Sequence, residues 1–304
     1  MQDPVGSFIR YIETTRRYSP NTVASYRRDI DRLLAYLGVT EETFDPARLT
    51  ADEVRAWVIS LSEEGLKPTS INRMLSAWGS FYKYLLREEA VVADPFRKVS
   101  ALKKPMTLPA FIPESRMSRL VNELAAEMDE GEDFCRRRDA LMVLFLYATG
   151  LRLAELIAID RTDFEKGFRE LHVRGKGDKE RIVPIVPELR ERIQAYLSAI
   201  RAENICLSGE KALFLTKKGN RISRSEVYRA IRRQLALFGI PGKRSPHVLR
   251  HTFATHMMNS GADLREIQEL LGHASLSATQ VYTHNSIAQL KEVYDAAHPH
   301  AREH

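Results

Sequence analysis

The chain has 304 residues, 44% of them hydrophobic and 28% charged, which is ordinary for a folded globular protein and enough for two domains with separate cores. Its net charge of +6 fits a polyanionic partner and a mildly basic cytosolic protein equally well. Two cysteines, Cys135 and Cys206, are too few for a disulfide scaffold, and no apolar run is long enough to span a bilayer. The N-terminal segment lacks a basic start followed by an apolar run, so we expect no secretory signal and a cytoplasmic location.

The first hundred residues read as helices separated by breaks, without any strand pattern. Apolar residues recur at helical spacing in each segment, and residues 1–104 therefore predict a small helical bundle. Its expected boundaries are an interruption at 19–21, a stop at Gly38, a capping box at Thr50 and Glu53, and a start at Lys67.

Residues 94–113 contain four prolines and four lysines or arginines without helical periodicity, and we interpret 105–113 as a linker to a second domain at 114–304. This second domain starts with helices predicted over 114–128 and 138–149, the latter apolar on all sides and therefore buried. Alternating residues on both sides of a glycine turn then predict a β-hairpin over 169–185 with Lys176 at its tip. Phe164 or residues 213–215 are expected to add a third strand.

Basic residues are concentrated between 217 and 244, where a helix starting at Ser223 turns its apolar residues inward and its arginines outward. Because the positive charges lie on one face of this helix, the pattern favours contact with DNA phosphates or bases. Such contacts predict an affinity that falls steeply with salt. The candidate DNA-binding residues, including four from the helical bundle, are Arg27, Arg28, Lys67, Arg73, Arg221, Arg224, Arg229, Arg232, Arg233, Lys243 and Arg244.

The segment from 245 to 282 carries the clearest chemical pattern. Ser245 and Pro246 predict a helix start, which places His247 and Arg250 on one face near the positive end of the helix dipole, where a phosphate binds well. Asp263 and Glu266 have the spacing of a second capping box. This second helix is expected to end at Gly272, directly before His273, and a third short helix to carry Tyr282. A phenol that attacks phosphorus needs guanidinium groups and acid–base partners, which these residues supply.

Four motifs occur in order: ATGLRLAEL at 148–156, RGKGDKER at 174–181, HVLR at 247–250, and LGH at 271–273 followed by Tyr282. Together they closely resemble the signature of the tyrosine site-specific recombinases, and most closely the Xer branch. Ala154 stands where many of these proteins carry serine. The resemblance implies a mainly α fold with a small antiparallel β-sheet, composed of an N-terminal helical core-binding domain that clamps DNA and a C-terminal catalytic domain.

The resemblance also implies that Tyr282 attacks a DNA phosphodiester to form a 3′-phosphotyrosyl link, without a metal or nucleotide cofactor. The remaining implied roles are Arg152 and Arg250 as phosphate ligands, Glu155 as their support, Lys176 as general acid with Lys179 as its rival, His247 as general base or phosphate ligand, and His273 as a hydrogen-bond donor. His251 and His256 are five residues apart, which does not suit a helical zinc site, and we interpret them as structural.

Further implications concern assembly and biology. Relatives of this type form cyclic tetramers on two DNA duplexes, so we expect a homotetramer or heterotetramer in which residues 287–304 dock onto a neighbour. A second recombinase and an accessory DNA translocase are further expected partners. The expected role is resolution of chromosome or plasmid dimers at the nucleoid, linked to cell division. Alternatives are an integrase or invertase of a mobile element, a type IB topoisomerase, and a catalytically silent DNA-binding protein. Phage-type integrases often carry an extra arm-binding domain, for which this chain has no room.

Overall fold

The computed structural model describes residues 3–103, 110–130, 133–165, 167–175, 180–205 and 209–272. The chain divides into two compact units, Met1–Thr107 and Leu108–His304, and the division falls inside the segment interpreted as a linker. Each unit has its own cluster of buried hydrophobic residues. No helix among the described residues is both long and apolar enough to cross a membrane.

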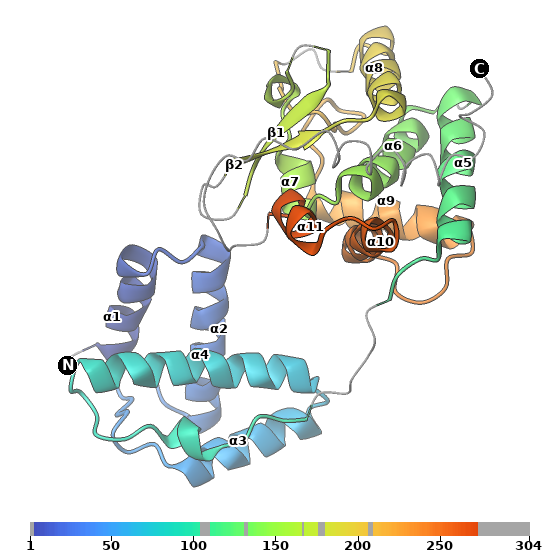
Figure 1. The fold of residues 1–304 in the computed structure, drawn as a ribbon. Helices are drawn as coiled ribbons and strands as arrows, with labels where there is room; N and C mark the ends of the chain where they lie inside the picture. Colours follow the sequence, from blue (N-terminus) through green and yellow to red (C-terminus); the bar gives the residue numbers. More distant parts are fainter. Residues whose placement is uncertain are drawn as a thin grey trace. The chain divides into compact units, whose positions relative to one another are not determined.

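The first unit is a bundle of helices (Figure 1). Its core contains Trp57 and Trp78, both fully buried. The indole nitrogen of Trp78 donates to the backbone carbonyl of Asp29 at 3.0 Å, and the Asp29 carboxylate pairs with Arg73, so these contacts join the second and fourth helices. The helices are α1 (Pro4–Arg10), a π-helical turn (Tyr11–Thr15), α2 (Pro20–Leu37), α3 (Ala51–Glu63), α4 (Pro68–Arg87) and a 3₁₀ turn (Pro95–Lys98).

Most predicted boundaries of this bundle are confirmed, and one interpretation is wrong. Thr50 and Glu53 form the predicted capping box, and Gly38 ends α2 in the left-handed conformation. The sequence predicts an interruption at 19–21, but α2 begins within it. Ser19 is the N-cap of α2, because its hydroxyl accepts a hydrogen bond from the Thr22 N–H and Pro20 occupies the first helical position.

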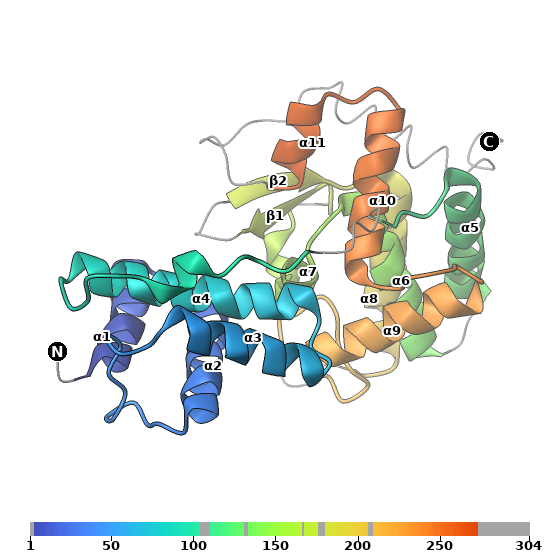
Figure 2. The same ribbon diagram turned by 90° about the horizontal axis from the view of Figure 1, so that it is seen from below.

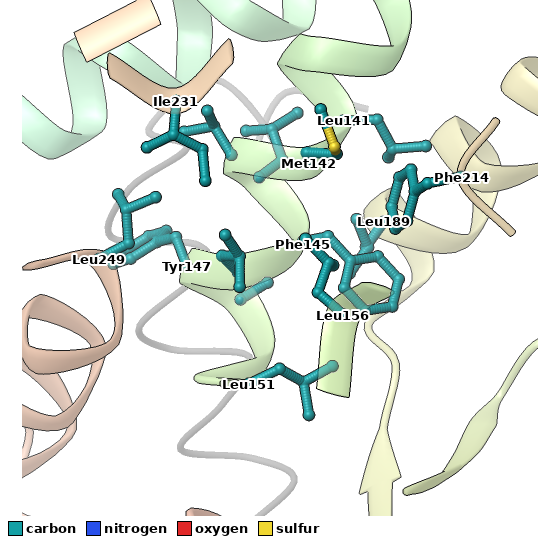
Figure 3. Close-up of a cluster of buried hydrophobic side chains, with 14 of the residues drawn as sticks. Leu141, Met142, Phe145, Tyr147, Leu151, Leu156, Leu189, Phe214, Ile231 and Leu249 are labelled. Atoms are coloured by element: carbon teal, nitrogen blue, oxygen red, sulfur yellow. The ribbon is translucent and has the colours of Figure 1, made fainter. Parts of the chain in front are cut away.

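The second unit is organised around α6, whose residues from 140 to 148 are apolar on every side. It packs against four other helices, α5, α8, α9 and α10. Figure 3 shows its side chains among Leu189 of α8, Ile231 of α9 and Leu249 of α10. A helix that is hydrophobic all round needs such complete coverage. The helices of this unit are α5 (Glu114–Glu130), α6 (Phe134–Thr149), α7 (Leu153–Ala158), a 3₁₀ turn (Arg161–Asp163), α8 (Pro187–Ala202), α9 (Arg224–Leu237), α10 (Pro246–Asn259) and α11 (Leu264–Leu270).

The predicted hairpin is present as β1 (Glu170–Arg174) and β2 (Glu180–Pro184), paired antiparallel with Leu171 opposite Val183. The expected third strand is wrong for the described residues: Phe164 makes only an isolated bridge to Leu171, and Leu215 one to Arg221. The fold class, mainly helical with a small antiparallel sheet, is confirmed.

Two helices place the end of the described chain beside the hairpin. α10 begins as predicted with Ser245 and Pro246, although the Ser245 hydroxyl makes no capping bond. The capping box predicted at α11 is wrong, because the Asp263 side chain accepts from the Arg265 N–H and no return bond from Glu266 exists. α11 packs on both α10 and β2 (Figure 2) and stops before Gly272, whose φ of +64° is left-handed.

Candidate active site

Arg152 follows directly on the buried end of α6. Gly150 closes that helix in the left-handed conformation, and Arg152 becomes the N-cap residue of α7. Its guanidinium donates from Nη1 to Glu155 Oε1 at 2.8 Å and from Nη2 to the Gly272 carbonyl at 2.9 Å. Its side chain is still 37% exposed, so one edge is anchored while the rest faces outward.

Arg250 extends from the second turn of α10 to the same place. Its Nη1 donates to the Gly150 carbonyl and its Nη2 to the Leu271 carbonyl, both at 2.6 Å. Burial, assisted by the positive charge of Arg152, lowers the pKa of Arg250 to about 10. The Arg250 guanidinium therefore stays charged at neutral pH. Because it is partly buried and lies near the positive charge of Arg152, a negatively charged ligand would stabilise it.

Glu155 is the one acidic partner of this cluster among the described residues, and its side chain is 6% exposed. Burial acts to raise the pKa of its carboxyl, but the hydrogen bonds and charge of Arg181, together with Arg152, hold that pKa below its ordinary value. The carboxylate is thus an anion that fixes arginines. Three guanidinium cations against this single carboxylate leave an excess of two positive charges, which suits a phosphodiester in its transition state.

Arg181 is a member of this cluster that sequence reasoning missed. It donates from Nη1 and Nη2 to the two oxygens of Glu155, at 3.1 and 2.7 Å, and from Nε to the Leu270 carbonyl at 2.9 Å. The sequence did contain a signal. Arg181 and Val183 lie two apart on β2 and so share the inward face of the strand, where a charged residue requires a partner.

His247 lies one turn before Arg250 on α10, is exposed, and shares its face through the i, i+3 spacing. Lys176, its rival Lys179, His273 and Tyr282 lie outside the described residues. The neighbouring described segments end at Gly175 and Gly272 and resume, between the two strands, at Glu180.

His256 has a structural role, as predicted. Its Nε2 lies 2.9 Å from the Ile112 carbonyl, which can only accept, so Nε2 carries the proton and Nδ1 accepts from the Tyr147 hydroxyl at 2.9 Å. Both ring nitrogens are therefore occupied. Among the described residues, no group of three or more histidine, cysteine or acidic side chains is arranged to hold a metal ion.

The candidate DNA-binding residues fall into two groups. Five make intramolecular contacts: Arg27 with Glu41, Arg73 with Asp29, Arg221 with Asp160 and Glu210, Arg233 with Asp139, and Arg244 with the Ile240 carbonyl. The other six are exposed: Arg28, Lys67, Arg224, Arg229, Arg232 and Lys243. The second group suits a ligand directly, whereas the first also fastens neighbouring elements to one another.

The fold and this cluster define a tyrosine recombinase. Residues 112–289 match the model of the phage integrase family, and residues 5–89 match that of the phage integrase N-terminal SAM-like domain, so the chain belongs to this family. It is a site-specific recombinase of the Xer-like type, an enzyme that breaks and rejoins DNA.

Relatives with curated names are similar over almost their whole length. The chain is 35% identical to tyrosine recombinase XerC of Pelotomaculum thermopropionicum, with 98% of each chain covered. It is also 35% identical to tyrosine recombinase XerD of Lacticaseibacillus casei, with 98% of this chain and 99% of that one covered. Among solved structures, XerH recombinase bound to a palindromic difH substrate after cleavage has the same fold, with a TM-score of 0.68, 21% identity, and coverage of 92% and 81%.

Proposed function

We propose that Tyr282 is the nucleophile of a strand transfer in which Arg152 and Arg250 hold the non-bridging oxygens of the reactive phosphate. The phenol oxygen forms a bond to phosphorus while the bond from phosphorus to the 5′ oxygen breaks. Lys176 protonates the departing 5′ oxygen, and His247 accepts the phenol proton or binds the phosphate. The free 5′ hydroxyl of one strand then attacks the phosphotyrosyl link on the partner duplex, with His273 hydrogen-bonding the transition state.

The observation that carries this proposal is the anchoring of the two arginines. A guanidinium has five N–H donors in a rigid fork. Arg152 directs one to Glu155 and one to the Gly272 carbonyl, and Arg250 directs two to carbonyls at 150 and 271. Three N–H groups on each arginine make no other hydrogen bond among the described residues, and in this proposal they bind the oxyanion from a guanidinium that is already oriented, which is how developing charge is stabilised best.

The DNA is held by both units in this proposal. The exposed arginines of α9, Arg224, Arg229 and Arg232, contact phosphates of the duplex from the catalytic unit. Arg28 and Lys67, which are exposed on the helical bundle, do so from the first unit. The active assembly is a tetramer on two sites, with residues 287–304 docked onto a neighbouring protomer and with a second recombinase or a DNA translocase as further partners.

The biological role that we infer is resolution of chromosome or plasmid dimers in the cytoplasm, at the nucleoid. Its support is the similarity to proteins named XerC and XerD over 98% of this chain. Equal identity to both types leaves the C and D assignments open, together with the alternative of an integrase or invertase of a mobile element.

The test uses a duplex with a nick near the reactive phosphate, so that the cut strand diffuses away and the covalent complex accumulates. Genomic fragments selected by binding to the protein supply the candidate sites. We expect a 3′-linked adduct on a denaturing gel with wild-type protein and none with Tyr282→Phe, whereas the control Tyr36→Phe, at an exposed position outside the site, keeps the adduct. An adduct that persists in Tyr282→Phe would show that another residue is the nucleophile.

A second arm of the same experiment separates the biological roles. A plasmid with two directly repeated copies of the selected site should resolve into two circles. Relaxation of a supercoiled plasmid that lacks the site would instead favour a topoisomerase, and tight binding without any adduct would favour a silent DNA-binding protein.

A further inference from the structure

Three successive carbonyls at the end of α11 are each bound by a different arginine. The Leu270 carbonyl accepts from Arg181 Nε at 2.9 Å, the Leu271 carbonyl from Arg250 Nη2 at 2.6 Å, and the Gly272 carbonyl from Arg152 Nη2 at 2.9 Å. The chain directly before His273 is therefore fastened to the same cluster that would hold the phosphate. Two of these arginines have a proposed place in the chemistry, and Arg181 does not.

Arg181 also completes the coordination of Glu155. Oε1 accepts from Nη1 of both Arg152 and Arg181, and Oε2 accepts from the Arg152 backbone N–H at 2.8 Å and from Arg181 Nη2. A carboxylate offers about four lone-pair positions, and all of them are used here. Loss of Arg181 would remove two of the four bonds, so that the carboxylate could turn and no longer fix the plane of the Arg152 guanidinium.

We propose that Arg181 is a positioning residue for strand cleavage: it fixes Arg152 through Glu155 and holds the hairpin in register with the end of α11. This inference rests on the proposed function of the cluster. Its side chain is 10% exposed, which leaves little room for direct contact with a phosphate. Because Arg181 lies on β2, Glu155 on α7 and Leu270 on α11, one guanidinium joins three elements, including the hairpin whose turn carries Lys176.

Close packing supports this role. A Cβ atom built on Gly272 would lie 3.0 Å from Arg181 Nη1, so the backbone at 272 and the guanidinium already lie at contact distance. Buried ion pairs add little net stability compared with apolar packing, and a pair retained at such a position is better explained by the geometry it specifies. Lysine would replace Arg181 only in part, because a compact ammonium lacks the planar fork that donates side by side to both oxygens of Glu155 while Nε donates to the Leu270 carbonyl.

The experiment measures single-turnover formation of the Tyr282 adduct on the nicked duplex at saturating protein, alongside DNA affinity and thermal unfolding. We expect Arg181→Met to lower the cleavage rate by about 10–100-fold, the range seen when a residue that orients a functional group is lost. DNA affinity should stay within about threefold, because the change affects the transition state rather than binding. Arg181→Lys should recover only part of the rate.

A matched control separates positioning from folding. Arg138 is equally buried, with a side chain 9% exposed, and it likewise binds a buried carboxylate, Asp139, and a backbone carbonyl, that of Leu215 at 3.0 Å. Arg138→Met should therefore lower the unfolding temperature about as much as Arg181→Met, while the folded protein cleaves at close to the wild-type rate.

Coupling to Glu155 is the decisive readout. If Arg181 acts through Glu155, the double variant Arg181→Met, Glu155→Gln should cleave about as slowly as the slower single variant, because both changes break the same chain of contacts. Multiplied losses, or wild-type cleavage by folded Arg181→Met, would overturn the proposal. A wild-type protein that forms no adduct on any bound duplex would instead overturn the proposed function, so the two failures are distinguishable.

Discussion

At the scale of single residues, the site shows how a few backbone carbonyls determine the behaviour of charged side chains. Arg250 is buried enough for its pKa to fall to about 10, yet its two bonds to the Gly150 and Leu271 carbonyls keep the fork oriented. Glu155 shows the opposite effect, since its arginine partners hold its pKa low despite burial. A phosphate that enters this cluster would meet groups that are already charged and already oriented.

His256 carries a residue-scale prediction about pH. Burial lowers its pKa, against smaller raising effects from the charge of Glu114 and the bond to the Ile112 carbonyl. Above the ordinary value of about 6.5 both the folded and unfolded forms are neutral, so stability is unaffected. As the pH falls below that value, the unfolded chain gains a proton that the folded chain resists. The free energy of unfolding should therefore fall, by at most about 1.4 kcal/mol per pH unit for this one proton.

The measurement is urea unfolding of wild type and His256→Gln, followed by far-UV circular dichroism between about pH 7.5 and about pH 5.5. Wild type should lose more stability over this range than the variant. Tyr147→Phe is the control, because it removes the hydroxyl that donates to Nδ1 but leaves His256 in place. The stability of this variant should therefore still fall over the range, while its difference from wild type changes less with pH. Parallel pH curves for wild type and His256→Gln would contradict the assignment.

How far residues could be predicted from sequence depended on whether their partners were near in the chain. Arg152 and Glu155 are three apart on one helix start, and His247 and Arg250 on another, so spacing alone placed each pair. The contact of Arg181 with Glu155 spans 26 positions, and its contact with the Leu270 carbonyl spans 89. No pattern of neighbouring residues in the sequence predicts contacts over such separations. Only the inward position of a charged residue on β2 hinted that a partner existed.

At the scale of elements, the turn between α6 and α7 is closely packed and leaves no room for a side chain at Gly150. Gly150 has a φ of +61°, and a Cβ added there would lie 2.5 Å from Phe253 Cδ1 and 2.8 Å from Leu271 Cδ2. We predict that Gly150→Ala costs about 2–4 kcal/mol, from the left-handed backbone and from overpacking together. It should also slow cleavage, because the Gly150 carbonyl anchors Arg250.

Gly239 offers the matched control for this prediction. It follows α9 in the same unit with a φ of +63°, but nothing lies within 4 Å of the position that a Cβ would take. Gly239→Ala should cost only the backbone contribution, about 1–2 kcal/mol, and leave cleavage unchanged. Urea unfolding and the adduct assay test both variants. Equal losses of stability in the two would show that close packing at Gly150 adds nothing.

Elements were predictable where the sequence carries local start and stop signals. The capping box at Thr50, the helix start at Ser223 and the helix stop at Gly38 lie where the sequence placed them. The helix α8 was not predicted at all, although Pro187 opens it. The prediction of a third strand was wrong, because Phe164 pairs with β1 through a single isolated bridge and no continuous ladder of hydrogen bonds follows. Whether a short segment becomes a strand depends on its pairing with a distant strand, and a local sequence pattern does not contain that information.

At the scale of the whole molecule, the two units have separate hydrophobic cores that share no residue. The chain contains two tryptophans, Trp57 and Trp78, and both are completely buried in the core of the first unit. Tryptophan emission therefore reports unfolding of the helical bundle alone. Far-UV circular dichroism reports both units, because both are largely helical.

This difference allows a prediction about cooperativity. Because each unit buries its own core, we expect the two to unfold as separate transitions in urea. Gly150→Ala should then shift the midpoint of the dichroism transition that belongs to the catalytic unit while the midpoint followed by tryptophan emission stays in place. Trp57→Phe would serve as the reverse control, since it alters the core of the helical bundle alone. If Gly150→Ala moved both midpoints together, the units would unfold as one cooperative body, and contacts between them would contribute to stability.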